Sequence, residues 1–251
     1  MSQHLTIITG ASRGMGLAMA TQLLQQGHDL LCISRKTQPD LDAIAQRAGT
    51  NCEQWPHDLS RGASVAAKLE TWLAARDSDT LASVTLINNA GALPRVAPLA
   101  DQEPDELADA LRVDLEAPML LTAAFLRATQ SWTAQRKVLN ISSGLGRRAM
   151  ASQALYCAAK AGMDHFSRCV ALEESQRPNG ARICSLAPGV IDTDMQVQMR
   201  GSDPGQFPDI GNFIGLKEKG LLTSPADAAT RVLAYLCREN FGAEAVADVR
   251  G

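Results

Sequence analysis

A short apolar run near the start of the chain leads directly into a cluster of glycines. The run covers residues 5–9, and Gly10, Gly14 and Gly16 follow it. Glycines allow a strand to turn sharply into a helix and allow backbone amides to approach a pyrophosphate at the helix N-terminus. The pattern therefore predicts a dinucleotide-binding strand, turn and helix. The alternative is a tight turn whose glycines serve packing alone.

Strand-like and helix-like segments alternate along the rest of the chain. This alternation predicts an α/β fold of the Rossmann type, a doubly wound parallel sheet with helices on both faces, in a single domain over residues 1–251. Ligands of such folds bind across the carboxyl ends of the strands. The apolar runs lie near 5–9, 30–33, 83–87, 137–141 and 181–186, and the helical stretches near 15–26, 61–75, 105–130, 154–174 and 225–238.

The end of the second apolar run bears on the choice of dinucleotide. Ser34, Arg35 and Lys36 follow that run, and Arg13 stands inside the glycine loop. An acidic residue at such a place binds the ribose 2′-hydroxyl of NAD, whereas an arginine accommodates the 2′-phosphate of NADP. Because no acid is present there, we expect NADP(H) as the cofactor. The alternative interpretation is that Arg35 and Lys36 form a solvated strand end.

Tyr156 and Lys160 are four residues apart in a segment with helical periodicity. Side chains at this spacing share one helix face, so the ammonium of Lys160 would lower the pKa of the phenol from its ordinary value near ~10. A phenol with a lowered pKa can exchange a proton near neutral pH. The same spacing also occurs by chance on exposed helices, so the pair depends on the other motifs for its meaning.

Composition excludes several classes of partner. The net charge is −3 and there is no basic stripe, so we expect no nucleic acid. The chain shows no signal pattern and no run near the ~20 apolar residues of a spanning helix, so we expect no membrane association. The six cysteines lack paired spacing, which indicates reduced thiols and a cytoplasmic location. The four histidines are scattered, and we expect no metal site.

Several motifs together resemble those of the short-chain dehydrogenase/reductase family, and the resemblance spans essentially the whole chain. Shorter stretches at 156–161, 171–174, 192–196 and 216–220 look like the sepiapterin reductase and benzil reductase branch of that family. The resemblance implies an NADP-dependent oxidoreductase acting on CH–OH or C=O groups. The motifs in order are residues 9–16, 88–91, 140–143, the pair Tyr156 and Lys160, and residues 188–193.

The resemblance also implies roles for individual residues. Ser143 would hold the substrate carbonyl oxygen, Tyr156 would donate the proton, and Lys160 would lower the pKa of the phenol and bind the nicotinamide ribose. Thr193 would contact the nicotinamide carboxamide. Asp58 would contact the adenine, with a helix N-cap as its alternative role. The cofactor residues implied are Gly10, Ser12, Arg13, Gly14, Met15, Gly16, Ser34, Arg35, Asp58, Leu59, Asn89, Ala90, Gly91, Tyr156, Lys160, Pro188, Gly189, Ile191 and Thr193.

One position departs from the family pattern. The family usually has an asparagine in the helix after the fourth strand, which links the catalytic lysine through water to solvent, and this chain has Asp114 in that place. A carboxylate accepts a hydrogen bond from the same water but cannot donate one. Its charge would also engage Lys160 if the two side chains met directly. We therefore include Asp114 among the catalytic residues and expect proton resupply to differ.

Residues 195–220 interrupt the alternation, being rich in Gly, Pro and Asp yet carrying large apolar side chains. We expect a lid whose apolar residues face the substrate. The alternative is a surface excursion whose apolar residues hold it to the body. Near the C-terminus, Asp248 resembles an aspartate that anchors the pterin ring, unless an edge strand places it in solvent. The predicted substrate residues are Ser143, Leu145, Met150, Met195, Met199, Phe207, Phe213 and Asp248.

These features favour an NADPH-dependent carbonyl reductase that transfers hydride to a small ketone, dicarbonyl or pterin side-chain carbonyl. A ketoacyl or hydroxysteroid oxidoreductase of the same family remains an alternative, because only the shape of the pocket distinguishes these activities. A catalytically lapsed NADP-binding regulator is a further alternative, motivated by Asp114. By resemblance, we expect a homodimer or homotetramer formed through the helices near 105–130 and 154–174.

Overall fold

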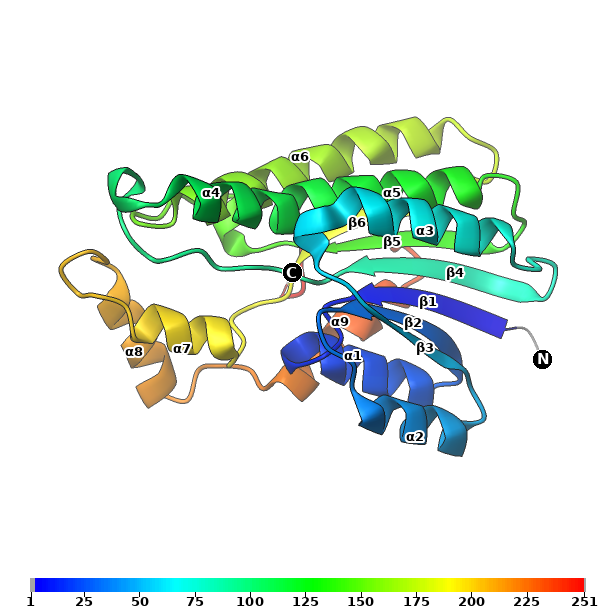
Figure 1. Cartoon of the computed structure of the whole chain (residues 1–251), viewed down its shortest axis with the longest axis horizontal. Helices are drawn as coiled ribbons and strands as arrows, with labels where there is room; N and C mark the ends of the chain where they lie inside the picture. The colour runs from blue at the N-terminus through cyan, green and yellow to red at the C-terminus, as the bar shows by residue number, and fades with distance from the viewer. Residues whose placement is uncertain (1–2, 251) are drawn as a thin grey trace.

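The computed structural model describes residues 3–250 and contains one parallel sheet of seven strands in the order β3-β2-β1-β4-β5-β6-β7 (Figure 1). The chain first winds outward through β2 and β3, then crosses to β4 and winds the other way. This crossover between β1 and β4 is where doubly wound sheets bind their ligands. The strands are β1 Gln3–Thr9, β2 His28–Ser34, β3 Cys52–Pro56, β4 Leu81–Asn88, β5 Gln135–Ile141, β6 Arg182–Ala187 and β7 Val246–Asp248.

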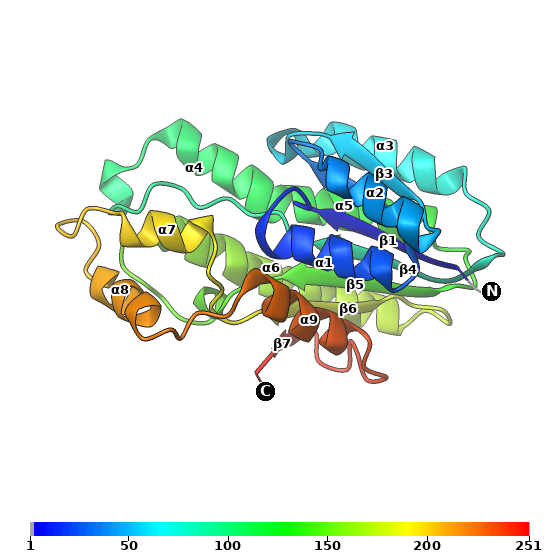
Figure 2. The same ribbon diagram turned by 90° about the horizontal axis from the view of Figure 1, so that it is seen from below.

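Helices cover both faces of the sheet. In Figure 1, α1, α2 and α9 lie below the sheet and α3, α4, α5 and α6 above it, while α7 and α8 lie beyond its carboxyl edge, at the left of Figures 1 and 2. The predicted Rossmann-type fold is confirmed. The helices are α1 Gly14–Gln25, α2 Pro39–Ala48, α3 Gly62–Ala74, α4 Pro104–Leu111, α5 Ala117–Ala128, α6 Ala154–Ser175, α7 Asp194–Arg200, α8 Ile210–Glu218 and α9 Pro225–Leu236.

Alternate residues of the central strands enter two separate hydrophobic cores. Ile8 and Cys32 pack with α1 and α9, whereas Ile7, Leu31 and Ile33 pack with α3 and α5. A parallel sheet is buried on both faces, so its strands are nearly continuous apolar runs. This is why the five runs in the sequence mark five of the strands.

Four features differ from the sequence-based expectation. Strand β3 and helix α2 were not predicted, and the single helix expected near 105–130 is interrupted. Between α4 and α5 the chain forms a π-helical turn at Arg112–Glu116, here labelled η3. The segment expected to be a lid contains helix α8 and most of helix α7. Within residues 3–250, no helix is both long and apolar enough to cross a membrane.

A pair of histidines lies at the amino end of the sheet, on neighbouring strands. The rings of His4 and His28 stack with centroids 5.0 Å apart, and Nδ1 of His28 lies 3.1 Å from the hydroxyl of Thr6. Burial lowers the pKa of His28 to about 4, and the nearby His4 and Lys137 act in the same direction, while Asp29 opposes them. The folded protein therefore favours the neutral ring of His28.

This pKa predicts acid-dependent stability. Between pH 6.5 and about 4 the unfolded chain binds a proton at His28 that the folded chain does not, so the free energy of unfolding should fall as the pH falls. We expect His28→Gln to remove about 1–2 kcal/mol of this pH dependence, less than the full linkage value because solvent screens a half-buried ring. Denaturant unfolding at pH 7 and pH 4.5 measures it. Equal pH dependence in both proteins would contradict the account.

Candidate active site

The turn between β1 and α1 is built so closely that two of its glycines have no room for a side chain. Gly10 has φ of 71°, and a Cβ there would lie 2.9 Å from the Cα of Ala90. A Cβ on Gly16 would lie 2.2 Å from the carbonyl oxygen of Gly10. The turn leaves the N-terminus of α1, at Gly14, at the carboxyl edge of the sheet, as an anion-binding turn requires.

The end of β4 holds this turn in place. Nδ2 of Asn89 donates to the carbonyl oxygen of Thr9 at 3.0 Å, and the Thr9 hydroxyl accepts from the backbone N–H groups of Asn89 and Ala90, each at 3.0 Å. The structure thus brings the predicted residues Gly10, Asn89 and Ala90 together. Sequence reasoning missed Thr9, although its place as the last residue of a strand, just before the glycines, was a usable signal.

The carboxyl end of β2 borders the same turn. The Oγ atom of Ser34 is buried without a hydrogen-bond partner, while Arg35 is exposed. Asp58 caps the short helix η1, Leu59–Arg61, by accepting from the N–H of Ser60 at 3.0 Å, and this bond lowers the pKa of its carboxyl. Asp58 therefore acts as a helix N-cap, the alternative role considered for it. Contact with the adenine stays a prediction for Asp58 and for the buried Leu59.

Tyr156 and Lys160 lie on the first turns of α6, and both are buried. The ammonium of Lys160 lies 5.5 Å from the centre of the Tyr156 ring and donates to the carbonyl oxygen of Ile141 at 3.1 Å. Ser143 follows β5, and its hydroxyl accepts from the N–H of Leu145 at 3.1 Å. The end of β5 and one face of α6 thereby bring the three predicted catalytic side chains to one place.

Asp114 is buried in the π-helical turn and reaches this group. Its Oδ1 accepts from the N–H of Ala92 at 2.9 Å and lies 3.9 Å from the ammonium of Lys160. A Cβ on Gly91 would lie 3.1 Å from the same oxygen, so the backbone passes close to the carboxylate. Single π-helical turns occur often at functional sites. The π-helical turn places the carboxylate of Asp114 where it contacts both the backbone after β4 and the ammonium of Lys160.

The net pKa shift of Tyr156 is opposite to the one expected from the sequence. Burial raises the pKa of the phenol, and the negative charge of Asp114 raises it further, whereas the charge of Lys160 and a hydrogen bond from Ser143 oppose the shift without reversing it. Burial also raises the pKa of Asp114, against the charge of Lys160. Desolvation disfavours both anions. The phenol is therefore held in its protonated form.

The segment after β6 contacts the glycine loop. Pro188 is buried, Gly189 has φ of 87°, and Ile191 forms a bridge with Thr223. The Cγ2 atom of Thr193 would lie 3.8 Å from a Cβ on Gly14, so the beginning of α7 is packed against the turn. Met195 approaches the place of a Gly91 Cβ to 3.5 Å. The predicted residues Thr193 and Met195 therefore lie beside the glycine loop and the end of β4.

Four apolar residues of 195–220 pack with apolar residues of the body in one cluster. Phe207 is fully buried, and its ring centre lies 5.4 Å from that of Phe213. Burying such a side chain contributes roughly 1.5–3 kcal/mol, so the cluster holds the segment against the body. In this arrangement Phe207 presents no surface to a ligand, and its substrate contact stays a prediction. The cluster contains Val96, Met199, Phe207 and Phe213, with Leu93, Met150 and Ile210 at its edge.

Asp248 and Arg147 each have a protein partner. The carboxylate of Asp248 accepts from Nε and Nη2 of Arg250 at 2.8 and 2.7 Å, and this lowers the pKa of Asp248. Nε of Arg147 donates to the buried Asp164 at 3.3 Å, and its Nη2 to the carbonyl oxygen of Ala247 at 2.7 Å. Arg147 therefore ties the loop after Ser143 to β7. The pterin-anchoring role of Asp248 stays a prediction.

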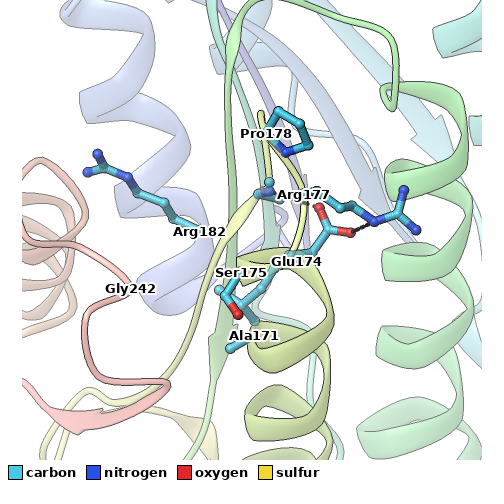
Figure 3. A pocket seen from close by; sticks show the side chains of 10 residues that line it. Ala171, Glu174, Ser175, Arg177, Pro178, Arg182 and Gly242 are labelled. Atoms are coloured by element: carbon cyan, nitrogen blue, oxygen red, sulfur yellow. Dashed lines mark hydrogen bonds and ion pairs between the residues drawn. The ribbon is translucent and has the colours of Figure 1, made fainter.

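A hollow away from these residues lies at the amino end of β6 (Figure 3). It has a volume of about 270 Å³ and is lined by the end of α6 and by Arg177, Arg182 and Gly242. The carboxylate of Glu174 accepts from Arg177 at 3.0 Å, from Arg136 at 3.3 Å and from the N–H of Ala181 at 2.8 Å. The charge and the hydrogen-bond acceptors of Glu174 are thus satisfied within the protein. We therefore interpret the hollow as the surroundings of a structural ion pair.

A dinucleotide-type glycine turn facing a buried Tyr–Lys pair defines the class of a nucleotide-dependent oxidoreductase. Comparison with known proteins agrees: a family model described as short chain dehydrogenase matches residues 4–203. The chain belongs to the short-chain dehydrogenase family.

Individual relatives cover almost the whole chain. Benzil reductase ((S)-benzoin forming) from Bacillus cereus is 36% identical over 94% of this chain and 94% of its own length. Sepiapterin reductase from Xenopus tropicalis is 32% identical over 92% of this chain and 90% of its own length. The crystal structure of a short-chain dehydrogenase/reductase from Burkholderia vietnamiensis is 35% identical, covers 99% of this chain and 98% of its own, and has a TM-score of 0.65. The predicted resemblance to the benzil and sepiapterin reductase branch is confirmed.

The position of Asp114 predicts a change in pH dependence. We expect Asp114→Asn to change turnover by less than about tenfold, because the amide can still accept from Ala92, and this corresponds to under ~1.4 kcal/mol on the barrier. Loss of the negative charge should lower the pKa of Tyr156. The alkaline limb of the pH–rate profile for reduction should therefore shift to lower pH. A pH–rate profile measures both effects.

The exposed Asp109, paired with Arg112 on the neighbouring turn, provides a control. Asp109→Asn removes the same charge at the surface and should leave both limbs of the pH–rate profile at their original pH. Complete loss of activity in a folded Asp114→Asn protein, or an unmoved alkaline limb, would contradict the role given to Asp114.

Proposed function

We propose that this protein is an NADPH-dependent carbonyl reductase that acts on a small ketone, a dicarbonyl or a pterin side-chain carbonyl. The observation that carries the proposal is the buried pair of Tyr156 and Lys160, whose ammonium lies 5.5 Å from the centre of the Tyr156 ring, beside Ser143 at the sheet edge that bears the glycine turn. Relatives named benzil reductase and sepiapterin reductase support a carbonyl substrate.

The proposed mechanism places the carbonyl oxygen between two hydroxyl donors. Ser143 donates one hydrogen bond to that oxygen and Tyr156 donates a second. As negative charge grows on the oxygen, the proton of Tyr156 moves to it. Burial raises the pKa of Tyr156, and the ammonium of Lys160 opposes that effect and stabilises the phenolate that remains once the proton has left. Asp114 holds Lys160 close by charge while leaving its hydrogen bond to Ile141 intact.

The residues around the glycine turn fit a dinucleotide with a 2′-phosphate. The cradle at Gly10 and Gly16 excludes side chains, so backbone amides can approach a pyrophosphate. At the end of β2, the hydroxyl of Ser34, which has no partner within residues 3–250, and the exposed guanidinium of Arg35 suit a ribose phosphate. When bound, NADPH supplies the hydride. Lys160 and Thr193 would hold its nicotinamide end.

The substrate would bind under a lid at 195–220, with Met195 nearest the catalytic group. Two bonds support a closed position of this segment: Nε2 of Gln198 donates to the carbonyl oxygens of Leu93 and Pro94, each at 3.1 Å. A pterin anchored at Asp248 would have to compete with Arg250 for the carboxylate. This competition favours a ketone or dicarbonyl over a pterin as the substrate.

We also propose a homodimer or homotetramer in the cytoplasm. The exposed Met119 on α5 and Leu172 on α6, 41% and 70% exposed, support association through these helices. The free cysteines support a reducing compartment.

A substrate panel tests the proposed activity. With NADPH, the protein should reduce benzil or simple diketones, and sepiapterin more weakly, as followed by the loss of reduced-nicotinamide absorbance. NADH should support slower turnover at the same concentration, because it lacks the 2′-phosphate that the basic residues are expected to bind. Nucleotide binding without turnover on any carbonyl would favour the regulator, and preference for ketoacyl thioesters or steroids would favour the other family activities.

A further inference from the structure

An ion pair joins the glycine loop to the beginning of α7. Nη1 of Arg13 lies 2.6 Å from Oδ2 of Asp194, a residue 181 positions later in the sequence. Arg13 is the N-cap residue of α1, and Asp194 is the first residue of α7. Together with the contact between Thr193 and Gly14, this pair brings the lid segment against the loop expected to hold the pyrophosphate.

The loop that carries Arg13 lies between Asp194 and the segment after β2. On one side, the guanidinium of Arg13 pairs with the carboxylate of Asp194. On the other is the segment after β2, because Nε2 of Gln38 donates to the carbonyl oxygen of Ser12, the neighbour of Arg13. That segment begins with the unpartnered hydroxyl of Ser34 and the exposed Arg35. A phosphate at the end of β2 and the carboxylate of Asp194 would therefore draw on the same guanidinium of Arg13.

Asp192, another acid just before the lid, has different partners. It accepts from Lys217 at 2.6 Å and lies 3.8 Å from Arg200, and both cations belong to the lid segment 195–220. Asp192 thus pairs with the lid, whereas Asp194 pairs with the glycine loop. The two acids are two positions apart and carry the same charge, but only Asp194 contacts Arg13. Comparing a substitution at each acid therefore separates the effect of the Arg13–Asp194 pair from the effect of removing one nearby negative charge.

We propose that Asp194 sets coenzyme selectivity by competing with the 2′-phosphate of NADPH for Arg13. The inference rests on the proposed NADPH dependence. The side chains of Arg13 and Asp194 are 66% and 71% exposed, so their pair is weak and opens readily. A phosphate offers more charge and more acceptor oxygens to the planar guanidinium and displaces the carboxylate. NADH carries no such group and leaves the pair in place. Asp194 therefore weakens the binding of NADPH and not that of NADH.

The test is direct binding of each coenzyme to the purified full-length protein by calorimetry. We expect Asp194→Asn to bind NADPH about two- to fivefold more tightly, the factor that an exposed ion pair provides, and to bind NADH within about 1.5-fold of the unaltered protein. Arg13→Gln should weaken NADPH selectively. In the Arg13→Gln background, Asp194→Asn should change neither affinity, because the competing pair no longer exists.

Asp192→Asn is the matched control, since it removes one lid charge that Arg13 does not contact. It should shift both coenzymes by one small common factor. The inference is overturned if Asp194→Asn shifts NADPH and NADH alike, weakens NADPH, or keeps its effect without Arg13. Selective loss of NADPH binding in Arg13→Gln together with no effect of Asp194→Asn overturns this inference alone. Equal loss of both coenzymes in Arg13→Gln overturns the proposed 2′-phosphate recognition as well.

Discussion

The proposed chemistry depends on the burial of Tyr156 beside one cation and one carboxylate. Removing a phenol from water raises its pKa, and here neither Lys160 nor Ser143 reverses that effect. A protonated phenol suits reduction, because the reaction needs a proton at the oxygen that gains charge. Lys160 matters most after the proton has left, when its charge stabilises the phenolate. The same burial that keeps the proton on Tyr156 makes that cation necessary.

The fold provides this burial through elements that meet at the carboxyl edge of the sheet. Helix α6 carries Tyr156 and Lys160, β5 ends in the loop with Ser143, and the π-helical turn before α5 carries Asp114. Asp114 also accepts from Ala92, just after β4, so a change at this carboxylate affects both the lysine and the backbone beside the glycine turn. The charge of Asp114, the backbone after β4 and the glycine turn expected to bind the cofactor therefore depend on one another.

The sequence predicts the fold well because apolar runs such as residues 5–9 alternate regularly with helical stretches, as in a parallel sheet covered on both faces. It does not predict β3, Cys52–Pro56, a short strand at the edge of the sheet whose apolar pattern is interrupted by Glu53 and Gln54. It fails at the π-helical turn, since the contact of Asp114 with Ala92 lies 22 residues away in sequence. The lowering of the Tyr156 pKa by Lys160, expected from their spacing, is present, but the sequence does not show the depth of burial, which raises the net pKa.

The central claim is that the phenol of Tyr156 delivers the proton to the reduced carbonyl. The most direct measurement is single-turnover reduction by Tyr156→Phe with saturating NADPH and a substrate found in the panel, with coenzyme binding measured on the same sample. The account predicts a rate roughly 10²–10⁴-fold lower than that of the unaltered protein, with coenzyme affinity retained. A rate near that of the unaltered protein, with hydride transfer still limiting, would contradict it.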